Sequence, residues 1–298
     1  MANQLTTNPA KRVACGAIRN LGYAGVFGLT LVCAVLLMSM IGPFIAPYDP
    51  YKFLAAPFSP SGSQFWLGTD VLGRDVLSRV LAGGYRIIAL SLLATILGVA
   101  AGSLFGIIAG YSKGTTDDLI MRSLDVAMAF PQIILALLFV SILGPQLWLI
   151  VVIVAALHAP QVARVARAAT LRVSEEDYVR YAESQGTSFV SIVVREILPN
   201  IRVPIGVELG LRFTYSIGLM SGLNFLGLGT QPPTPDWGLM INENRIGMAA
   251  SPYAVVVPVL LIGVLTIGVN LTIDVLARSG GRSGVDVAEP LVSGEPFH

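Results

Sequence analysis

Long apolar runs, separated by shorter polar segments, dominate the chain. The runs cover approximately residues 21–46, 87–110, 124–143, 147–163, 203–228 and 253–277. Most are close to the ~20 residues that an α-helix needs to cross the hydrocarbon core of a bilayer. The pattern therefore predicts an all-α, polytopic membrane protein with six transmembrane helices. The first run is too long for the apolar part of a cleaved signal peptide, so we expect it to remain as a span.

The polar segments divide the chain into five parts. We expect a cytoplasmic N-terminal segment (1–20), a first transmembrane helix (21–46), an external loop with a short amphipathic helix (47–86), a five-helix core (87–277) that contains a long polar loop (164–200), and a disordered Gly- and Ser-rich tail (278–298). Six spans place both termini on one side. With the N-terminus inside, thirteen of the nineteen Lys and Arg residues are cytoplasmic: three before the first span, two after the second, six from Arg164 to Arg202 and two in the tail. The positive-inside rule favours this orientation.

The polar loop has the pattern of two short helices joined by a glycine. Ser174 can cap a helix that runs to Gln185, because its hydroxyl can accept a hydrogen bond from a backbone amide of the first turn. Gly186 suits the left-handed conformation that commonly ends a helix. A second helix begins near Phe189 and carries apolar residues at a spacing of three and four; it is expected to end just before Pro199.

The spacing of Gly186 and Pro199, with Ala182 upstream, resembles the EAA loop of bacterial ABC importer permeases. In that family the first helix of the loop docks on a separate ATPase subunit and passes its motion to the membrane. The resemblance implies an ATPase-coupling loop made of Tyr178, Arg180, Tyr181, Ala182, Glu183, Gly186, Leu198 and Pro199. Where the family usually has Glu-Ala-Ala, this chain has Arg180-Tyr181-Ala182, so the nearby Glu183 becomes the candidate for the family's glutamate. The alternative is a solvated amphipathic helix without a special partner.

A second motif, GTDVLGRD, lies in the predicted external loop and comprises Gly68, Thr69, Asp70, Gly73, Arg74 and Asp75. Thr69 or Asp70 can cap the short amphipathic helix, which is expected to lie at the membrane surface. The aspartates superficially suggest a calcium loop, but the D-x-D-x-D-G spacing is absent. This motif and the stretch QPPTPDWG (231–238) resemble signatures of the dipeptide, oligopeptide and nickel branch of importer permeases, and the chain resembles its C-type subunit. The resemblance covers about residues 20–278 and implies the type I ABC importer permease fold.

Composition excludes several classes of function. Charged residues make up 12% of the chain and hydrophobic residues 54%, whereas soluble domains are usually about a quarter charged. A net charge of +1 gives no bulk attraction to nucleic acid. Two cysteines and two histidines are too few for a disulfide framework or a metal site. None of the three lysines completes the phosphate-binding motif G-x-x-x-x-G-K-[ST], so we expect ATP and Mg²⁺ on partner subunits and no cofactor or enzymatic activity on this chain.

Ionisable residues at membrane depth are costly and are therefore candidates for function. Glu208 and Arg212 are four residues apart in the fifth predicted span and can pair on one helix face. Two interpretations are retained: a structural ion pair, or contact with a charged substrate in the translocation path. A separate pattern, glycine at every fourth position from 98 to 110, predicts close helix packing in the second span.

Together these features favour a channel-forming subunit of an ATP-driven importer in the bacterial cytoplasmic membrane, for di- or oligopeptides or similar small polar solutes. The resemblance implies alternating access, with a homologous second permease, two ATP-binding subunits, an external solute-binding protein and membrane lipid as partners. One alternative is a secondary transporter or channel that works without ATP, for which we find no internal repeat. Another is a membrane scaffold without transport. The substrate stays open among short peptides, nickel chelates, glutathione and opine-like compounds.

Overall fold

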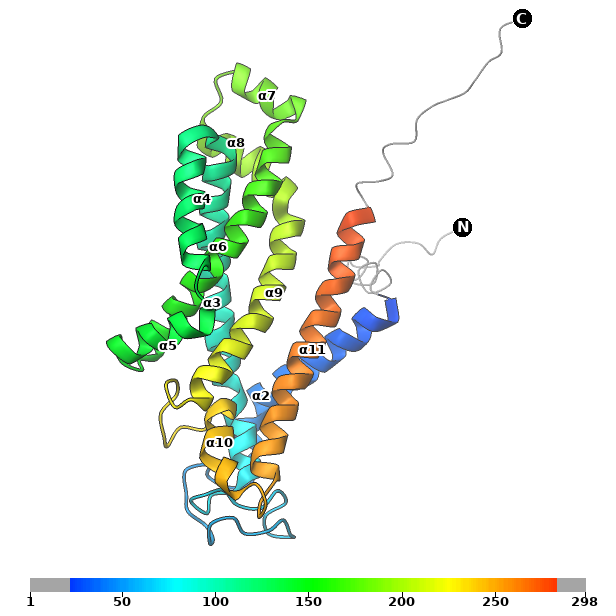
Figure 1. The fold of residues 1–298 in the computed structure, drawn as a ribbon. Coiled ribbons are helices and arrows are strands. Elements are labelled where there is room, and N and C mark those ends of the chain that lie inside the picture. Colours follow the sequence, from blue (N-terminus) through cyan, green and yellow to red (C-terminus); the bar gives the residue numbers. More distant parts are fainter. Residues whose placement is uncertain (1–21, 283–298) are drawn as a thin grey trace, which may run out of the picture.

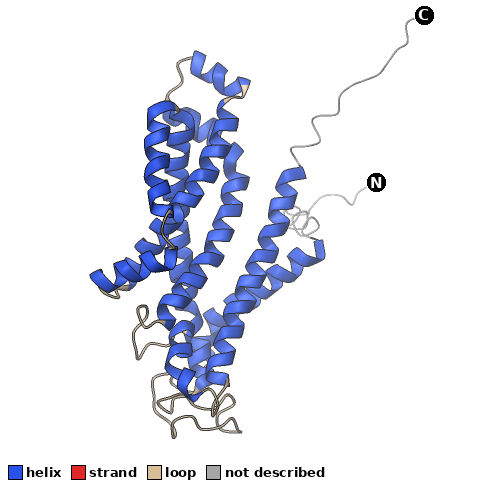
Figure 2. Ribbon diagram, in the orientation of Figure 1, coloured by secondary structure: helices blue, strands red, loops and turns tan. Residues whose placement is uncertain are grey.

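The computed structural model describes residues 22–282, and every regular element in this range is a helix (Figure 2). The elements are α2 (Gly22–Ile45), α3 (Val76–Ser112), α4 (Gly114–Met128), α5 (Gln132–Leu143), α6 (Leu147–Ser174), α7 (Asp177–Ser184), α8 (Phe189–Ile192), a π-helical segment η1 (Val193–Ile197), α9 (Leu198–Phe225), α10 (Trp237–Asn244), a 3-10 turn η2 (Arg245–Gly247) and α11 (Tyr253–Arg282). The all-α prediction is confirmed.

The predicted N-terminal segment and residues 283–298 lie outside the described range. The helix α11 includes residues 278–282, so the predicted disordered tail begins too early.

The helices form an elongated bundle (Figure 1). In it α3, α6 and α9 pack against one another, and α2 and α11 pack together beside them. The two polar regions lie at opposite ends: α7 and α8 at one end, and α10 with the loop 46–75 at the other. The segments predicted to face the cytoplasm and the outside are therefore separated by the length of the bundle.

The helix α3 is longer than the second predicted span. It has 37 residues, or about 55 Å at 1.5 Å per residue, against a hydrocarbon core of about 30 Å. Its first turns contain Val76 and Val80, which are both buried. The predicted short amphipathic helix is therefore wrong as a separate surface element, because its apolar face packs into the bundle as the beginning of α3.

Close packing of α3 against α6 confirms the expectation from the glycine spacing. A Cβ added at Gly98 would lie 2.8 Å from the carbonyl oxygen of Ala155, and one at Gly102 would lie 2.5 Å from that of Ala159. Such distances leave no room for a side chain. The glycines thus allow the two backbones to approach directly, as small residues do at membrane helix interfaces.

Four helices of the described range are long and apolar enough to cross a membrane: α2, α3, α6 and α11. The third predicted span (124–143) is instead divided into α4 and α5, which meet at 82° around Pro131 and together could form a fifth span. The fifth predicted span corresponds to α9, whose 28 residues include the charged pair Glu208 and Arg212. Length and composition thus support four or five of the six predicted spans, and α9 as a span stays a prediction.

The polar loop 164–200 differs from its predicted form in two places. The helix α6 continues to Ser174, whose hydroxyl donates to the carbonyl of Leu171, so Ser174 ends one helix instead of capping the next. The first loop helix is α7, which begins at Asp177 and has no side-chain cap. The second loop helix does not end before Pro199, because α8 passes through η1 directly into α9 and Pro199 lies in its first turn, where a missing backbone amide is tolerated.

Candidate coupling surface and polar sites

The helix α7 makes one apolar contact with the bundle and leaves most of its surface free. Val179 is completely buried, whereas Tyr178 and Tyr181 are 42% and 67% exposed. Arg180 is also exposed, and it has no ion-pair partner within residues 22–282. In Figure 1 α7 is the outermost element at its end of the bundle. The two tyrosines and the arginine thus form an open surface at this end.

The turn after α7 confirms the predicted conformation of Gly186, whose φ is 74°. Its backbone amide donates to the carbonyl of Glu183 at 2.9 Å, and the amide of Thr187 donates to the carbonyl of Ala182 at 3.1 Å. These are the two hydrogen bonds of a Schellman cap. An added Cβ at Gly186 would meet nothing within 4 Å. The backbone conformation alone therefore requires glycine here, and it gives α7 a defined end.

The side chain of Glu183 contacts the bundle. Its carboxylate accepts a hydrogen bond from the hydroxyl of Tyr111, at the end of α3, over 2.7 Å. The ring of Tyr111 in turn packs on that of Phe189, with centroids 5.1 Å apart. This contact ties α7 to α3. A contact of Glu183 with an ATPase, in the role of the family's glutamate, would have to compete with the bond to Tyr111.

A small apolar cluster beneath α7 connects it to the long helices. Its buried members are Ile107, Val179, Ile192, Ile197 and Ile201, which come from α3, α7, α8, η1 and α9 in that order. Ala182 packs against the edge of this cluster, while Leu198 is 40% exposed and Pro199 is exposed too. Since the cluster includes residues of both α3 and α9, a displacement of α7 would act directly on both helices.

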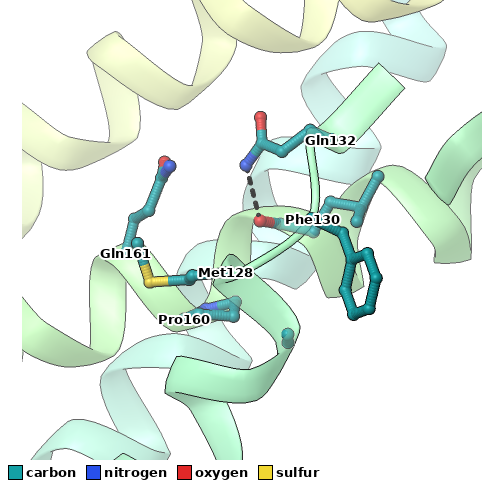
Figure 3. Close-up of a pocket in the computed structure, with 7 residues that line it drawn as sticks. Met128, Phe130, Gln132, Pro160 and Gln161 are labelled. Carbon is teal, nitrogen blue, oxygen red and sulfur yellow. Dashed lines mark hydrogen bonds between the residues drawn. The ribbon is translucent and has the colours of Figure 1, made fainter. Parts of the chain in front are cut away.

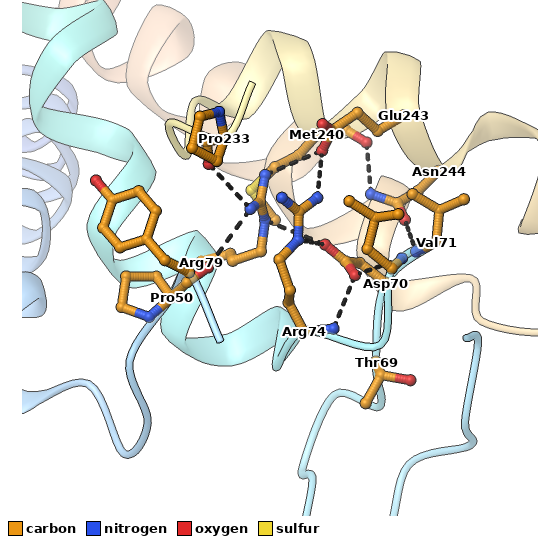
Figure 4. Close-up of polar contacts among 12 residues, drawn as sticks. Pro50, Thr69, Asp70, Val71, Arg74, Arg79, Pro233, Met240, Glu243 and Asn244 are labelled. Atoms are coloured by element: carbon orange, nitrogen blue, oxygen red, sulfur yellow. Dashed lines mark hydrogen bonds and ion pairs between the residues drawn. The ribbon is translucent and has the colours of Figure 1, made fainter. Parts of the chain in front are cut away.

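At the opposite end, the predicted external motif forms a buried ion cluster (Figure 4). The carboxylate of Asp70 lies 2.6 Å from Nε of Arg74 and 3.3 Å from Nε of Arg79, the latter without hydrogen-bond geometry. Glu243 of α10 accepts a hydrogen bond of 2.9 Å from each arginine. Two acidic and two basic side chains balance each other, and both arginines are at most 1% exposed. The cluster thus joins the loop, α3 and α10 without leaving an open binding position.

The other residues of the external motif shape the loop. Gly68 and Gly73 both have φ near 74°, and a Cβ at Gly68 would lie 2.5 Å from a backbone oxygen of the loop. Thr69 is buried, and its hydroxyl donates to the carbonyl of Ala56 at 2.8 Å. Asp75 caps α3 by accepting the amide of Ser78 at 2.8 Å. The predicted caps, Thr69 and Asp70, are therefore wrong: the cap lies at the end of the motif.

The second signature, 231–238, packs against the beginning of α3. The indole of Trp237 donates to the carbonyl of Val80 at 2.9 Å. Asp236 caps α10 by accepting the amide of Gly238 at 2.9 Å, and it also accepts Nδ2 of Asn224 at 2.7 Å. Burial raises the pKa of Asp236 to about 6. The two signature stretches, far apart in sequence, thus form one structural unit at the external end.

Glu208 and Arg212 are paired as the sequence predicts, with 2.9 Å between Oε2 and Nε. Arg212 also donates through Nη1 to the side-chain oxygen of Gln161 on α6, and its guanidinium lies 5.0 Å from the ring centroid of Tyr215. Both charged residues are buried. Sequence reasoning missed Gln161; the only available signal was a polar residue near the end of the apolar run 147–163.

A chain of buried polar side chains crosses the centre of the bundle near this pair. Nε2 of His158 on α6 lies 2.9 Å from the hydroxyl of Ser216 on α9, which lies 2.9 Å from the hydroxyl of Thr95 on α3. All three residues have no exposed surface. These contacts connect the three central helices at one level. Within residues 22–282, no group of three or more His, Cys, Asp or Glu side chains could hold a metal ion.

Comparison with known proteins agrees with this architecture. Residues 102–279 match the family model described as "Binding-protein-dependent transport system inner membrane component". The chain is 37% identical to the glutathione transport system permease protein GsiD of Pectobacterium atrosepticum strain SCRI 1043, over 84% of this chain and 83% of the relative. It is also 37% identical to the GsiD proteins of Escherichia coli O6:K15:H31 strain 536 and Shigella boydii serotype 4 strain Sb227, over 82% of this chain and 81% of each relative. These matches confirm the predicted resemblance to ABC importer permeases of the peptide branch. The chain is a multi-pass protein of the inner membrane and belongs to the family of binding-protein-dependent transport system inner membrane components.

Proposed function

We propose that this chain is one of two homologous permease subunits of an ATP-driven importer, and that a separate ATP-binding subunit docks on α7. The observation that carries the proposal is the geometry of α7. The helix has a defined end at Gly186 and a free face with Tyr178, Arg180 and Tyr181. Its opposite face is anchored by Val179 in a cluster shared with α3 and α9.

This arrangement supports a coupling mechanism. ATP binding would bring two ATP-binding subunits together and displace α7 with them. Since α7 is bonded to α3 through Glu183 and Tyr111 and packs on α9 through the apolar cluster, its displacement would tilt both helices. The bundle would then change between inward-facing and outward-facing states, so that transport proceeds by alternating access. ATP and Mg²⁺ would bind only to the partner subunits.

The packing of the bundle supports the need for a second permease. Buried apolar side chains, including those of Val154, Ile217, Met220 and Leu223, fill most of the space between the central helices, and the polar side chains there are themselves enclosed. Within the described residues, such a core offers a polar solute no open route. The translocation path would therefore form between this chain and a homologous permease, on a surface to which the central helices contribute.

Charge supports an orientation, and the relatives support a substrate. By the positive-inside rule, the α7 end and both termini would lie in the cytoplasm, and a solute-binding protein would then deliver its load at the α10 end. The relatives are named for glutathione transport, so we assign short peptides and glutathione-like solutes to this chain. Membership of a binding-protein-dependent family argues against the alternative of a transporter that works without ATP.

Cysteine cross-linking in the assembled transporter tests the docking of α7. In a background in which Cys15 and Cys33 are changed to serine, Tyr181→Cys should form a disulfide with a cysteine placed in the groove of the ATP-binding subunit. Tyr51→Cys is the control, because Tyr51 is 48% exposed at the opposite end; it should react instead with an impermeant thiol reagent added outside intact cells. The proposal fails if Tyr181→Cys gives no ATPase adduct, or if the external reagent labels it.

A further inference from the structure

Arg212 is a buried arginine with part of its guanidinium unused. It lies near the middle of α9, and its side chain is 10% exposed. Nε donates to Glu208 and Nη1 donates to the neutral amide of Gln161, whereas Nη2 has no hydrogen-bond partner within residues 22–282. Nη2 is also not among the fully enclosed unpaired atoms of the described chain. The edge formed by Nη1 and Nη2 thus holds no anion, although this edge is the one that binds carboxylates in a bidentate manner.

A hollow lined by Gln161, the residue that accepts from Nη1 of Arg212, lies where the break between α4 and α5 meets α6 (Figure 3). Its walls include Met128, Phe130, Gln132, Pro160 and Gln161, and its volume is about 50 Å³. That volume has room for about three or four water molecules, which fits one carboxylate group and is too small for a whole peptide. The amides of Gln132 and Gln161 lie on its two sides in Figure 3, and the oxygen of Gln161 is the one that accepts from Arg212.

The contrast with the external ion cluster shows that the pair at Arg212 is different in kind. There, Arg74 and Arg79 share two carboxylates and are completely enclosed. Here, one carboxylate occupies only one nitrogen of Arg212, and a neutral side chain occupies another. Breaking a buried pair is costly, while a well-packed apolar replacement is often neutral. A single ion pair at this depth is therefore poor evidence for a stabilising role. Ionisable groups inside membranes commonly mark substrate pathways.

We propose that Arg212 binds the carboxylate of a peptide-like solute during translocation, with Glu208 as the internal anion that balances the charge when the solute is absent. The solute carboxylate displaces Gln161 from Nη1 and takes the Nη1–Nη2 edge, which weakens the bond to Glu208. The two carboxylates then repel each other, so the solute is held only transiently. The freed amide of Gln161 can pair with the neighbouring peptide group, and so can the side-chain oxygen of Gln132, whose Nε2 donates to the carbonyl of Leu157 at 2.8 Å. The inference rests on the proposed function and adds the residue that recognises the solute: Arg212 would bind a free carboxylate that lies beside an amide.

Uptake of glutathione by the complete transporter in proteoliposomes, with its solute-binding protein, tests the assignment. Arg212→Gln should lower uptake about tenfold or more at subsaturating glutathione, because a hydrogen-bonded charge contact is lost, and Arg212→Lys should recover part of it. Glu208→Gln removes the competing anion, so it should lower both KM and kcat. Arg164→Gln is the matched control: it removes an ion pair with Asp125 elsewhere on α6, where both side chains are about half exposed, and should leave uptake unchanged.

Gln161→Glu keeps the inference testable if Arg212→Gln does not assemble. The change has nearly the same shape, and it places a fixed carboxylate on Nη1 where the solute should bind. We expect a complex that still copurifies with its ATP-binding subunits and loses most glutathione uptake. Normal uptake by Gln161→Glu, or recovery of uptake in the double variant Glu208→Gln/Arg212→Gln, would reduce Arg212 to a structural partner. The proposed function fails separately, if the unchanged complex shows no ATP-dependent uptake.

Discussion

Replacing Gly186 with valine tests whether α7 must end sharply in order to couple ATP hydrolysis to transport. The φ of Gly186 is 74°, a conformation that costs other residues about 1–3 kcal/mol, with β-branched residues at the upper end. No atom would lie within 4 Å of the added Cβ, so the cost is backbone strain and not a clash. If the turn relaxes instead, two capping hydrogen bonds are lost, each worth about 1 kcal/mol.

This cost is comparable with what holds α7 in place. Only Val179 of α7 is fully buried, and burial of one valine contributes about 1.5–3 kcal/mol. The bond between Glu183 and Tyr111 adds about 1 kcal/mol. The strain of Gly186→Val can therefore loosen α7, whereas it removes no contact from the main core. We expect the variant to insert and assemble, to hydrolyse ATP, and to lose most of its ATP-dependent uptake.

The measurement is the number of ATP molecules hydrolysed per solute imported in proteoliposomes, together with hydrogen exchange of the α7 amides. Gly144→Val is the matched control, because Gly144 also has a positive φ, of 92°, and open space around its Cβ position, but it lies between α5 and α6. Normal uptake by Gly186→Val would refute the coupling role of α7. An equal loss in Gly144→Val would trace the effect to backbone strain in general.

Two further predictions concern packing and protonation. Gly102→Leu should prevent assembly, because even its Cβ would lie 2.5 Å from a carbonyl oxygen, whereas Gly206→Ala meets nothing within 4 Å and should leave the melting temperature nearly unchanged. Protonation of Asp236 should contribute up to about 3 kcal/mol of stability as the pH falls from 7.5 through 6 toward 4, because burial raises the pKa of Asp236 to about 6 and the folded state then holds the proton more tightly than the unfolded state. Asp236→Asn should remove this dependence on pH from the melting curves. The variant should be at least as stable at pH 7.5, since the new side-chain amide can donate toward the hydroxyl of Thr230, which has no well-aligned partner among the described residues. A clearly lower melting temperature of the variant at pH 7.5 would show that the charged cap is needed.

Local signals in the sequence were sufficient where the structure depends on local geometry. Gly186 was identified because a helix that ends in a left-handed turn favours glycine, and the pairing of Glu208 with Arg212 follows from their spacing on one helix. The start of α7 was misplaced, since Ser174 satisfies the pattern of a cap equally well but bonds back to Leu171 within α6. A pattern of capping residues does not say which of two adjacent helices the residue serves.

Contacts between distant segments could not be predicted in the same way. Asp70 and Arg74 were recognised as motif residues, but Glu243, the second partner of Arg74, lies on α10 and carried no signal in the sequence. Charged residues are rarely fully buried unless they are paired, and burial is favourable here because the four charges balance each other. Gln161 was missed for the same reason, since its significance depends on Arg212 of another helix.

The two ends of α3 are attached to different elements, and this difference gives the proposed mechanism a direction. At the external end, α3 is capped by Asp75 and joined to α10 by the Arg79–Glu243 bond. At the other end, α3 meets α7 mainly through the bond from Tyr111 to Glu183 and the small apolar cluster. The coupling end of α3 also packs directly on α6, since a Cβ at Gly110 would lie 2.8 Å from the carbonyl oxygen of Arg167. A force applied to α7 should therefore move the coupling ends of α3 and α6 together while the external end acts as the pivot. Such tilting would change the polar contacts that a solute meets at the level of Arg212, between the two ends.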